Sequence, residues 1–202
     1  MPGVAVLSKA SAGTSERRRE AEQGFLAATE ALLDGGSSYA ELSVEQIASR
    51  AGRPRTAFYL YFRDKRELLM RLTEDVAEVL YQEADRWWSG TRGREDVRPA
   101  LADILRTWAE HASLLGAVVE ASTYDEEIGA FWRGLVGRFI DATERRLVAD
   151  GEEPGAAAAK AFVLCWMANH ACYQQIARGE SLDDPALLDA LTEILGRSVY
   201  GD

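Results

Sequence analysis

Residues 42–69 read LSVEQIASRAGRPRTAFYLYFRDKRELL, and the pattern predicts two short helices joined by a tight turn. Ser43 and Gln46 have the spacing of a capping box, in which two side chains satisfy each other's backbone N–H groups at a helix start. The Ala51-Gly52 pair then interrupts the helical recurrence of apolar residues. Because glycine accepts the backbone angles that end a helix, the first helix is expected to stop there.

The second helix is expected from about Pro54 to Tyr61, and a third is expected to begin at Lys65. Asp64 and Glu67 repeat the capping-box spacing at that point. Two short helices joined by a turn of small residues form a helix-turn-helix. In that motif the second helix enters the major groove of DNA, so the stretch predicts a DNA-binding unit.

Charge is distributed unevenly along the chain. The net charge of −10 by itself argues against a nucleic-acid partner. Residues 1–71, however, carry 11 basic and 9 acidic side chains, whereas residues 72–202 carry 12 and 24. An acidic body with a locally basic head suits a protein that presents one face to phosphate. The basic residues of the predicted motif are Arg50, Arg53, Arg55, Arg63, Lys65, Arg66 and Arg71.

Residues 51–69 resemble the signature of TetR-type transcriptional repressors. That signature has Ala-Gly, a short recognition helix ending in aromatic-Tyr-x-Tyr/His-Phe, and a lysine that opens the next helix. The counterparts in this sequence are Ala51-Gly52, Phe58-Tyr59-Leu60-Tyr61-Phe62 and Lys65. Two further runs, WMANH at 166–170 and SVYGD at 198–202, are similar to the EthR branch of that family.

The resemblance implies an all-α fold of about nine helices, with a helix-turn-helix head on a body for ligand binding and dimerisation. The head is expected at residues 15–66 and the body at 67–202. Residues 1–14, rich in Ala, Ser and Gly, are expected to form a disordered arm. Apolar periodicity predicts the other helices at about 15–34, 65–88, 97–122 (one or two helices), 125–149, 156–178 and from 184 onward.

The expected DNA-binding residues are Ser43, Arg53, Arg55, Thr56, Tyr59, Tyr61 and Lys65. Arg55 and Thr56 begin the recognition helix, where arginine can bond guanine bidentately and a threonine methyl can meet a thymine methyl. The resemblance implies phosphate contacts for Tyr59, Tyr61 and Lys65. The alternative for the two tyrosines is packing in the core.

Two positions depart from the family pattern. Pro54 lies where the family usually has a Ser or Thr cap, and Ala57 lies where it often has Thr. Both changes remove a hydroxyl that could cap the recognition helix or contact phosphate. Arg53 and Arg55 would compensate electrostatically, so the operator sequence is affected more than DNA binding itself.

A ligand pocket is expected in the body, mainly because of the resemblance. The candidate residues are Trp108, Tyr124, Phe131, Trp132, Phe139, Trp166, Asn169 and Tyr173. Asn169 is the clearest polar group on an apolar helix, and ligand pockets are mostly apolar with a few placed polar groups. An uncharged, hydrophobic or aromatic effector is therefore expected. The alternative is that these aromatic residues only fill the core.

The last two predicted helices are apolar over more than one face, which suggests a partner surface. The resemblance implies that they pair with their copies in a four-helix bundle of a homodimer. The expected interface residues are Leu187, Leu191, Ile194 and Leu195. The alternative is that these leucines serve only the core of one subunit.

Enzyme chemistry finds little support in the sequence. His111 and His170 are isolated, and neither begins an H-E-x-x-H metal pattern. The G-x-S-x-G motif and phosphate-cradling glycine loops are missing from the sequence. No catalytic residue, metal or cofactor is therefore expected.

The cysteines and the apolar runs indicate in which cell compartment the protein acts. Cys165 and Cys172 would lie roughly 10 Å apart along one helix, too far for a mutual disulfide. The longest apolar run, 161–168, is far shorter than a membrane span. The first residues do not follow a signal-peptide pattern. A cytoplasmic protein is expected, with no membrane partner.

Together these features predict a homodimeric repressor that binds a pseudo-palindromic DNA operator and is released by a small hydrophobic effector. The alternative is a helical small-molecule-binding module without sequence-specific DNA binding. The reason to consider it is that Pro54 and Ala57 differ from the family pattern.

Overall fold

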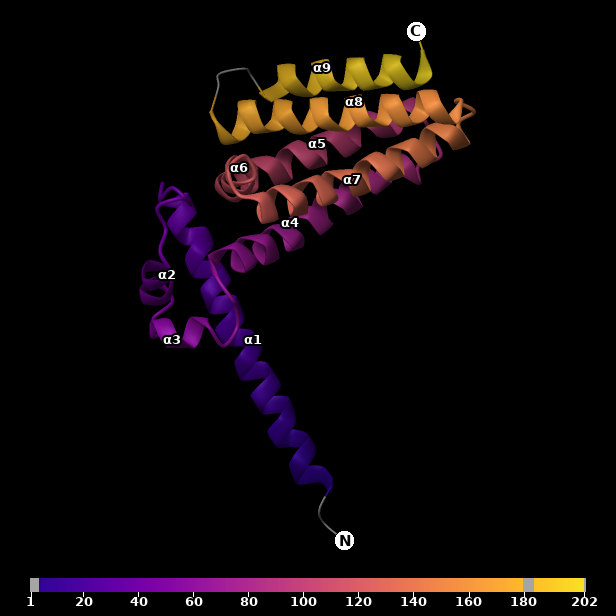
Figure 1. Ribbon diagram of the computed structural model, residues 1–202. Helices are drawn as coiled ribbons and strands as arrows, with labels where there is room; N and C mark the ends of the chain where they lie inside the picture. Colours follow the sequence, from indigo (N-terminus) through magenta and orange to yellow (C-terminus); the bar gives the residue numbers. More distant parts are fainter. Residues whose placement is uncertain (1–3, 180–183, 202) are drawn as a thin grey trace. The chain divides into compact units, whose positions relative to one another are not determined.

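The computed structural model describes residues 4–179 and 184–201, with side chains for 16–179 and 185–201, and every regular element in these ranges is a helix (Figure 1). The all-α prediction is confirmed. The elements are α1 (Val4–Asp34), α2 (Val44–Arg50), α3 (Arg55–Phe58), α4 (Lys65–Trp88), α5 (Arg94–Glu110), α6 (Ala112–Ala121), α7 (Glu126–Ala149), α8 (Pro154–Cys172), the π-helical turn η1 (Tyr173–Ala177) and α9 (Asp184–Tyr200).

The chain forms two compact units, Met1–Leu69 and Met70–Asp202. The first contains α1, α2, α3 and the start of α4, and we call it the head. The second contains the rest of α4 and α5 to α9, and we call it the body. The expected boundary, between residues 66 and 67, falls inside α4 close to this division.

Helix α1 begins at Val4 and not near Ser15. A disordered arm was expected over residues 1–14; from Val4 onward the structure has helix instead, and residues 1–3 lie outside the described residues. The physical reason is that extending an existing helix adds one backbone hydrogen bond per residue without a new nucleation cost. Residues 4–14 contain no proline that would stop this extension.

The head is built around a small aromatic core. Phe25 of α1 contacts Phe58 edge-on, with ring centroids 5.5 Å apart. Phe58 lies 5.4 Å from Phe62, which follows α3. All three rings are buried, as is Ile47 of α2. Edge-on and tilted aromatic pairs of this kind add specific attraction to apolar burial, so they help to hold α3 against α1.

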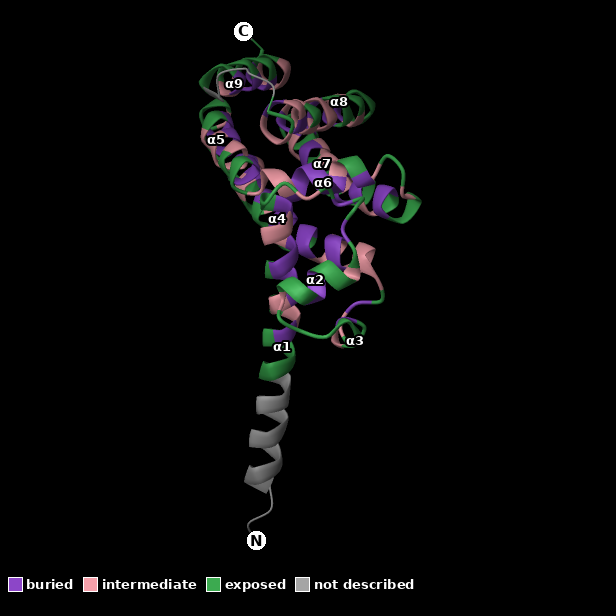
Figure 2. Ribbon diagram, turned by 90° about the vertical axis from the view of Figure 1, so that its left-hand side faces the viewer, coloured by how far each residue is buried: buried purple, intermediate pink, exposed green. Residues whose placement is uncertain are grey.

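In the body, α7 packs along α8 and α5 packs along α9. Figure 2 shows that most body helices are buried along one side only. One cluster of the core joins α4, α5, α8 and α9 through Trp87, Val97, Ala100, Leu101, Leu164, Leu187, Leu191 and Leu195. The body helices therefore enclose an apolar interior.

Arg146 of α7 anchors the carboxyl end of α4. Its Nη1 donates hydrogen bonds of 2.8–3.0 Å to the carbonyl oxygens of Trp87, Trp88 and Gly90. Its Nε donates to Asp150, 2.8 Å away. Carbonyls at a helix end have no partners within the helix, and a cation there is favourable. This contact positions Trp87 and Trp88, which line the cavity described below.

Candidate DNA-contacting surface and ligand cavity

The start of α2 has the predicted capping box. The Gln46 backbone N–H donates to Ser43 Oγ at 3.2 Å, and the Ser43 backbone N–H donates to Gln46 Oε1 at 2.9 Å. The Ser43 hydroxyl also donates to Gln46 Oε1 at 2.8 Å. Ser43 is therefore engaged with Gln46, and its place among the DNA-binding residues stays a prediction.

The turn after α2 depends on Gly52, whose φ of +66° is in the left-handed region. The Arg53 N–H donates to the Ala48 carbonyl oxygen at 2.9 Å, which closes the end of α2. A residue with a Cβ would be strained at this φ. The Ala51-Gly52 stop predicted from the sequence is thus the residue pair that redirects the chain into α3.

Helix α3 has four residues, Arg55–Phe58, and is shorter than the predicted span from Pro54 to Tyr61. Pro54 is the N-cap and gives no side-chain hydrogen bond to the helix. After Phe58 the backbone continues in tight turns, with the Leu60 N–H bonded to the Ala57 carbonyl. The i→i+3 bonds of Leu60 to Ala57 and of Tyr61 to Phe58 replace the α-helical pattern, so the α-helical segment ends at Phe58.

Four of the seven side chains expected to meet DNA are exposed in and around α3. Arg53, Arg55, Thr56 and Tyr59 are all exposed. Arg55 Nη2 donates to Tyr59 Oη at 3.3 Å, and the Arg55 guanidinium lies 5.9 Å from the centre of the Tyr59 ring. This hydrogen bond raises the pKa of Arg55 above its ordinary value. The Arg55 guanidinium is thus oriented by the Tyr59 hydroxyl.

Leu60 was not singled out in the sequence, yet its side chain is 69% exposed beside Tyr59. Tyr61 behaves differently from Tyr59. It is half-buried, its ring centre lies 5.8 Å from that of Phe25, and Arg18 of α1 lies 5.9 Å above it. The alternative of core packing therefore applies to the Tyr61 ring.

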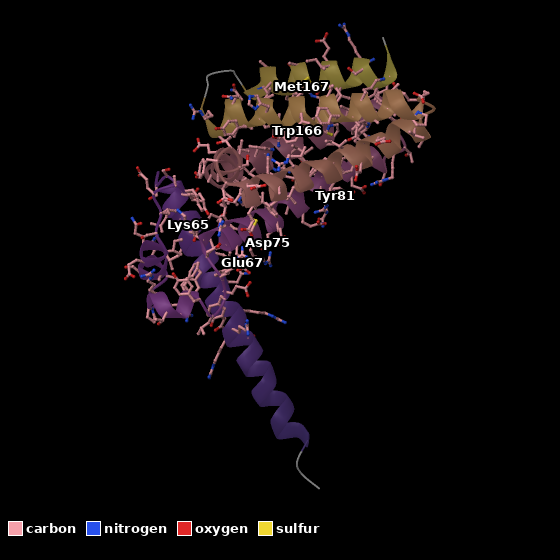
Figure 3. The ribbon with its side chains drawn as sticks, in the orientation of Figure 1. Lys65, Glu67, Asp75, Tyr81, Trp166 and Met167 are labelled. Atoms are coloured by element: carbon pink, nitrogen blue, oxygen red, sulfur yellow. The ribbon has the colours of Figure 1, made fainter. Side chains whose placement is uncertain are left out.

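Lys65 requires a correction. Its Nζ donates to the carbonyl oxygens of Tyr39, Ala40 and Leu42 at 3.0, 3.1 and 2.9 Å. An ammonium has three hydrogens, and three carbonyls accept them all. The phosphate contact expected from the resemblance therefore lacks a free donor. Figure 3 labels Lys65 at the start of α4.

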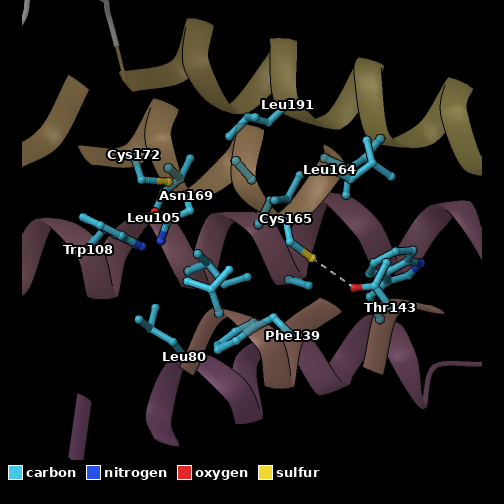
Figure 4. Close-up of a pocket in the computed structure, with 18 of the residues that line it drawn as sticks. Leu80, Leu105, Trp108, Phe139, Thr143, Leu164, Cys165, Asn169, Cys172 and Leu191 are labelled. Atoms are coloured by element: carbon cyan, nitrogen blue, oxygen red, sulfur yellow. Dashed lines mark hydrogen bonds between the residues drawn. The ribbon is translucent and has the colours of Figure 1, made fainter. Parts of the chain in front are cut away.

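The body contains a cavity of about 130 Å³ (Figure 4). Four of the predicted pocket residues line it: Trp108, Trp132, Phe139 and Asn169. The other residues that line it are Ala77, Leu80, Ala84, Trp87, Trp88, Val97, Ala100, Leu101, Ile104, Leu105, Leu115, Leu135, Val136, Thr143, Leu164, Cys165, Ala168, Cys172, Leu191 and Leu195. None of these residues is charged.

Four other predicted pocket residues do not line the cavity. Tyr124 is exposed, and Tyr173 Oη donates to Glu120 at 3.5 Å. Phe131 and Trp166 each directly adjoin a lining residue in the sequence. Neither Phe131 nor Trp166 is among the residues that line the cavity. Trp166 instead lies near Phe162, with ring centres 6.4 Å apart.

The polar groups of the cavity are few. Thr143 Oγ1 accepts a hydrogen bond from Trp88 Nε1 at 3.1 Å and lies 3.5 Å from Cys165 Sγ. The Asn169 amide projects into the cavity near Trp108 (Figure 4). Burial raises the pKa of the Cys165 thiol, and it raises that of Cys172 to about 12. Both sulfurs are therefore neutral thiols at ordinary pH.

The predicted dimer residues also need correction. Leu187, Leu191 and Leu195 are buried in the core of the single chain, and the last two line the cavity. They recur every four residues, so they form one stripe that faces α5. Ile194 is 44% exposed. The large exposed apolar residues on α8 are Phe162, at 55%, and Val163, at 60%.

No helix in the part of the chain that the structure describes is long and apolar enough to cross a bilayer. No group of three or more His, Cys, Asp or Glu side chains among those residues could hold a metal ion.

The sequence matches two known family descriptions. Residues 25–72 match "Bacterial regulatory proteins, tetR family", and residues 97–201, more than half of the chain, match "Transcriptional regulator EthR, C-terminal domain". The protein therefore belongs to the TetR family of transcriptional regulators, which is not a family of enzymes. Its body places it in the EthR-like branch of that family.

Individual relatives agree with this assignment. The HTH-type transcriptional regulator EthR of Mycolicibacterium smegmatis is 30% identical over 138 residues, which span 67% of this chain and only 63% of that relative. EthR of Mycobacterium tuberculosis is 26% identical over 192 residues, 90% of this chain and 88% of the relative. The crystal structure of a TetR-like transcriptional regulator from Rhodococcus sp. RHA1 has a TM-score of 0.67 at 23% identity, covering 90% of this chain and 97% of that one.

Proposed function

We propose that the protein is a ligand-responsive transcriptional repressor that binds a pseudo-palindromic operator as a homodimer and is released by a small hydrophobic effector. The observation that carries this proposal is the exposed surface of Arg53, Arg55, Thr56 and Tyr59 at the turn and helix that follow α2. The uncharged cavity of the body supports the effector site.

The head would read DNA through α3. Arg55 would bond the O6 and N7 atoms of a guanine, and the Thr56 methyl would contact a thymine. Arg53 and Tyr59 would bind phosphates on either side. The contact with Tyr59 restricts the Arg55 side chain before DNA arrives, which reduces the ordering cost of binding. Each neutralised phosphate contributes about −0.9 to the slope of log affinity against log salt.

The cavity favours a neutral effector of limited size. Its volume of about 130 Å³ is close to the ~150 Å³ of a cavity that admits benzene, so it suits one ring-sized apolar group. A charged ligand would lose its hydration without a counter-charge among the lining residues. Asn169 offers both an N–H donor and a carbonyl acceptor. The effector class is therefore a neutral aryl or alkyl compound with one polar group.

A second copy of the chain would cover the exposed apolar residues Phe162, Val163 and Ile194 of α8 and α9. Contiguous exposed apolar side chains on a small protein mark an interaction site. A two-fold dimer would present two heads to two half-sites, which is why a pseudo-palindromic operator is proposed. An effector that favours another spacing of the heads would weaken DNA binding, with a coupling of about 1–3 kcal/mol.

The direct test is a titration of labelled DNA from upstream of the protein's own gene, with excess nonspecific competitor and in a salt series. We expect tight, saturable binding that weakens steeply with salt. Calorimetry with a panel of neutral aryl amides would then identify a compound that binds the body and releases the DNA. If no upstream fragment binds above the competitor, the repressor proposal is wrong.

A second candidate function is a helical small-molecule-binding module without sequence-specific DNA binding. The observation in its favour is the uncapped, four-residue α3 after Pro54. Under this alternative, calorimetry would detect a neutral ligand while the DNA titration would show only weak, sequence-independent association.

A further inference from the structure

The Lys65 side chain joins two parts of the head that are far apart in the sequence. Its acceptors, the carbonyl oxygens of Tyr39, Ala40 and Leu42, belong to the turn between α1 and α2. The ammonium also lies 4.7 Å from the centre of the Tyr39 ring. A cation close to an aromatic ring is attracted by its π-electrons. Four contacts thus hold one lysine nitrogen on one turn of backbone.

The surroundings of Lys65 are those of a structural cation. The side chain is half-buried, and burial lowers its pKa below the ordinary value for lysine. The three carbonyl dipoles replace the water that burial removes. A lysine whose ammonium is turned into the protein in this way does not extend toward a DNA phosphate.

Both ends of this connection are held by further hydrogen bonds. At the α4 end, Asp64 accepts hydrogen bonds from the backbone N–H groups of Arg66 and Glu67, which fixes the first turn of the helix. At the other end, Ser43 caps α2 directly after Leu42. Because both segments are held by their own hydrogen bonds, the Lys65 contacts determine the distance between the turn before α2 and the first turn of α4.

We infer that Lys65 is a positioning residue, which holds the turn before α2 against the first turn of α4 and thereby places α2 and α3 for DNA binding. The inference rests on the proposed function, since it assigns Lys65 a role in DNA recognition. Because Lys65 belongs to α4, a displacement of the first turn of α4 would be passed through these hydrogen bonds to α2.

The test compares Lys65→Met, which keeps the length and apolar stem of the side chain, with Arg53→Ala and wild type. DNA affinity is measured by anisotropy across a salt series. We expect Lys65→Met to bind about tenfold more weakly or worse, because charge-assisted hydrogen bonds are lost. Its salt slope should equal that of wild type, whereas Arg53→Ala, which loses a phosphate contact, should reduce the slope by about 0.9.

Amide hydrogen exchange gives a second readout that does not need DNA. Residues 39–47 should exchange faster in Lys65→Met than in wild type, while the body should be unchanged. Lys160→Met is the matched control, since it removes the same charge from α8, where Lys160 pairs with Glu152. It should leave both the slope and the exchange of residues 39–47 unaltered.

Three results would overturn the inference: a slope reduced by about 0.9 in Lys65→Met with unchanged exchange, which identifies a phosphate contact; wild-type affinity; or wild-type exchange at residues 39–47. If wild type binds no DNA, the proposed function fails instead. The exchange measurement then still decides whether Lys65 holds the turn.

Discussion

Arg55 shows how one intramolecular contact can prepare a side chain for recognition. Long arginine side chains lose rotamer freedom when they bind, and this cost weakens association. Arg55 is already directed by its hydrogen bond to Tyr59, although both side chains are exposed. The expected benefit is specificity, because a directed guanidinium can bond two acceptors of one base only when the base is correct.

Arg55→Ala should therefore relax base preference more than it weakens DNA binding overall. At the base pair that Arg55 reads, we expect a loss of about 1–3 kcal/mol of discrimination. Competition titrations with single-base operator variants would measure it. Arg133→Ala, an exposed arginine on α7, is the control with the same change of charge. Unchanged preference at every position in Arg55→Ala would contradict the reading role.

Asn169→Leu should weaken binding of a neutral amide effector by about 1–2 kcal/mol, because the ligand's polar group would lose its partner in an apolar cavity. Calorimetry would measure the change. Gln174→Leu is the matched control, since Gln174 of η1 bonds the exposed His170 and does not line the cavity. Equal losses in the two variants would exclude a specific contact at Asn169.

At the scale of elements, the ends of the helices decide how the functional residues are placed. Helix α4 is preceded by Asp64, whose carboxylate accepts from the N–H groups of Arg66 and Glu67 at 2.9 and 3.0 Å. Glu67 reaches back to the N–H of Arg63 at 2.6 Å. The predicted capping-box spacing therefore gives the predicted helix start, with Arg63 in place of Asp64 as the donor to Glu67.

Asp64→Ala should destabilise the protein by about 1 kcal/mol, the usual cost of a lost N-cap, as measured by urea unfolding at neutral pH. Burial opposes ionisation of Asp64, but hydrogen bonds from Arg66 and Glu67 outweigh it and lower the pKa of the carboxyl. The folded pKa is thus below the unfolded one. The stabilisation is present above the ordinary aspartate pKa and is lost as pH falls through the folded pKa.

The difference between Asp64→Ala and wild type should accordingly shrink in strong acid. A difference that stays constant from neutral pH down to pH 2 would show that the charge of Asp64 does not contribute to capping.

Local signals in the sequence predicted the starts of α2 and α4, but they did not predict the start of α1, the end of α3 or the longer-range contacts. Ser43 and Gln46 are three residues apart, so their pairing follows from spacing alone. Trp132 and Phe131 have equal apolar character, and only the packing of α7 decides that Trp132 faces the cavity. The acceptors of Lys65 lie 23 to 26 residues away in the sequence. They are backbone carbonyl groups, which every residue has, so the residue types do not indicate which of them Lys65 contacts.

The same limit explains the interface residues. Leu187 and Leu191 were predicted at a dimer interface, because the sequence does not reveal how much of α9 is covered by α5. Exposure in the folded chain instead singles out Phe162 and Val163 of α8. At the scale of the whole molecule, Phe162 and Val163 of α8 and Ile194 of α9 are the exposed apolar residues that we propose to meet a second copy.

Phe162→Asp should shift the protein from dimer to monomer, since burying a carboxylate in an apolar interface is costly. Light scattering after size exclusion would give the mass, and DNA binding should weaken because the two heads are no longer linked. Val148→Asp, which adds the same charge at an exposed apolar residue of α7, should remain dimeric. A dimer that survives Phe162→Asp would move the interface away from α8.

The placement of the five tryptophans gives the molecule its own optical probes. Four of them, Trp87, Trp88, Trp108 and Trp132, surround the cavity, while Trp166 lies beside Phe162 on α8. Replacing Trp166 by Phe would leave fluorescence that originates only from the cavity walls. Emission from this variant would report effector uptake, and its difference from wild-type emission would report Trp166 beside the proposed dimer surface, without any attached dye.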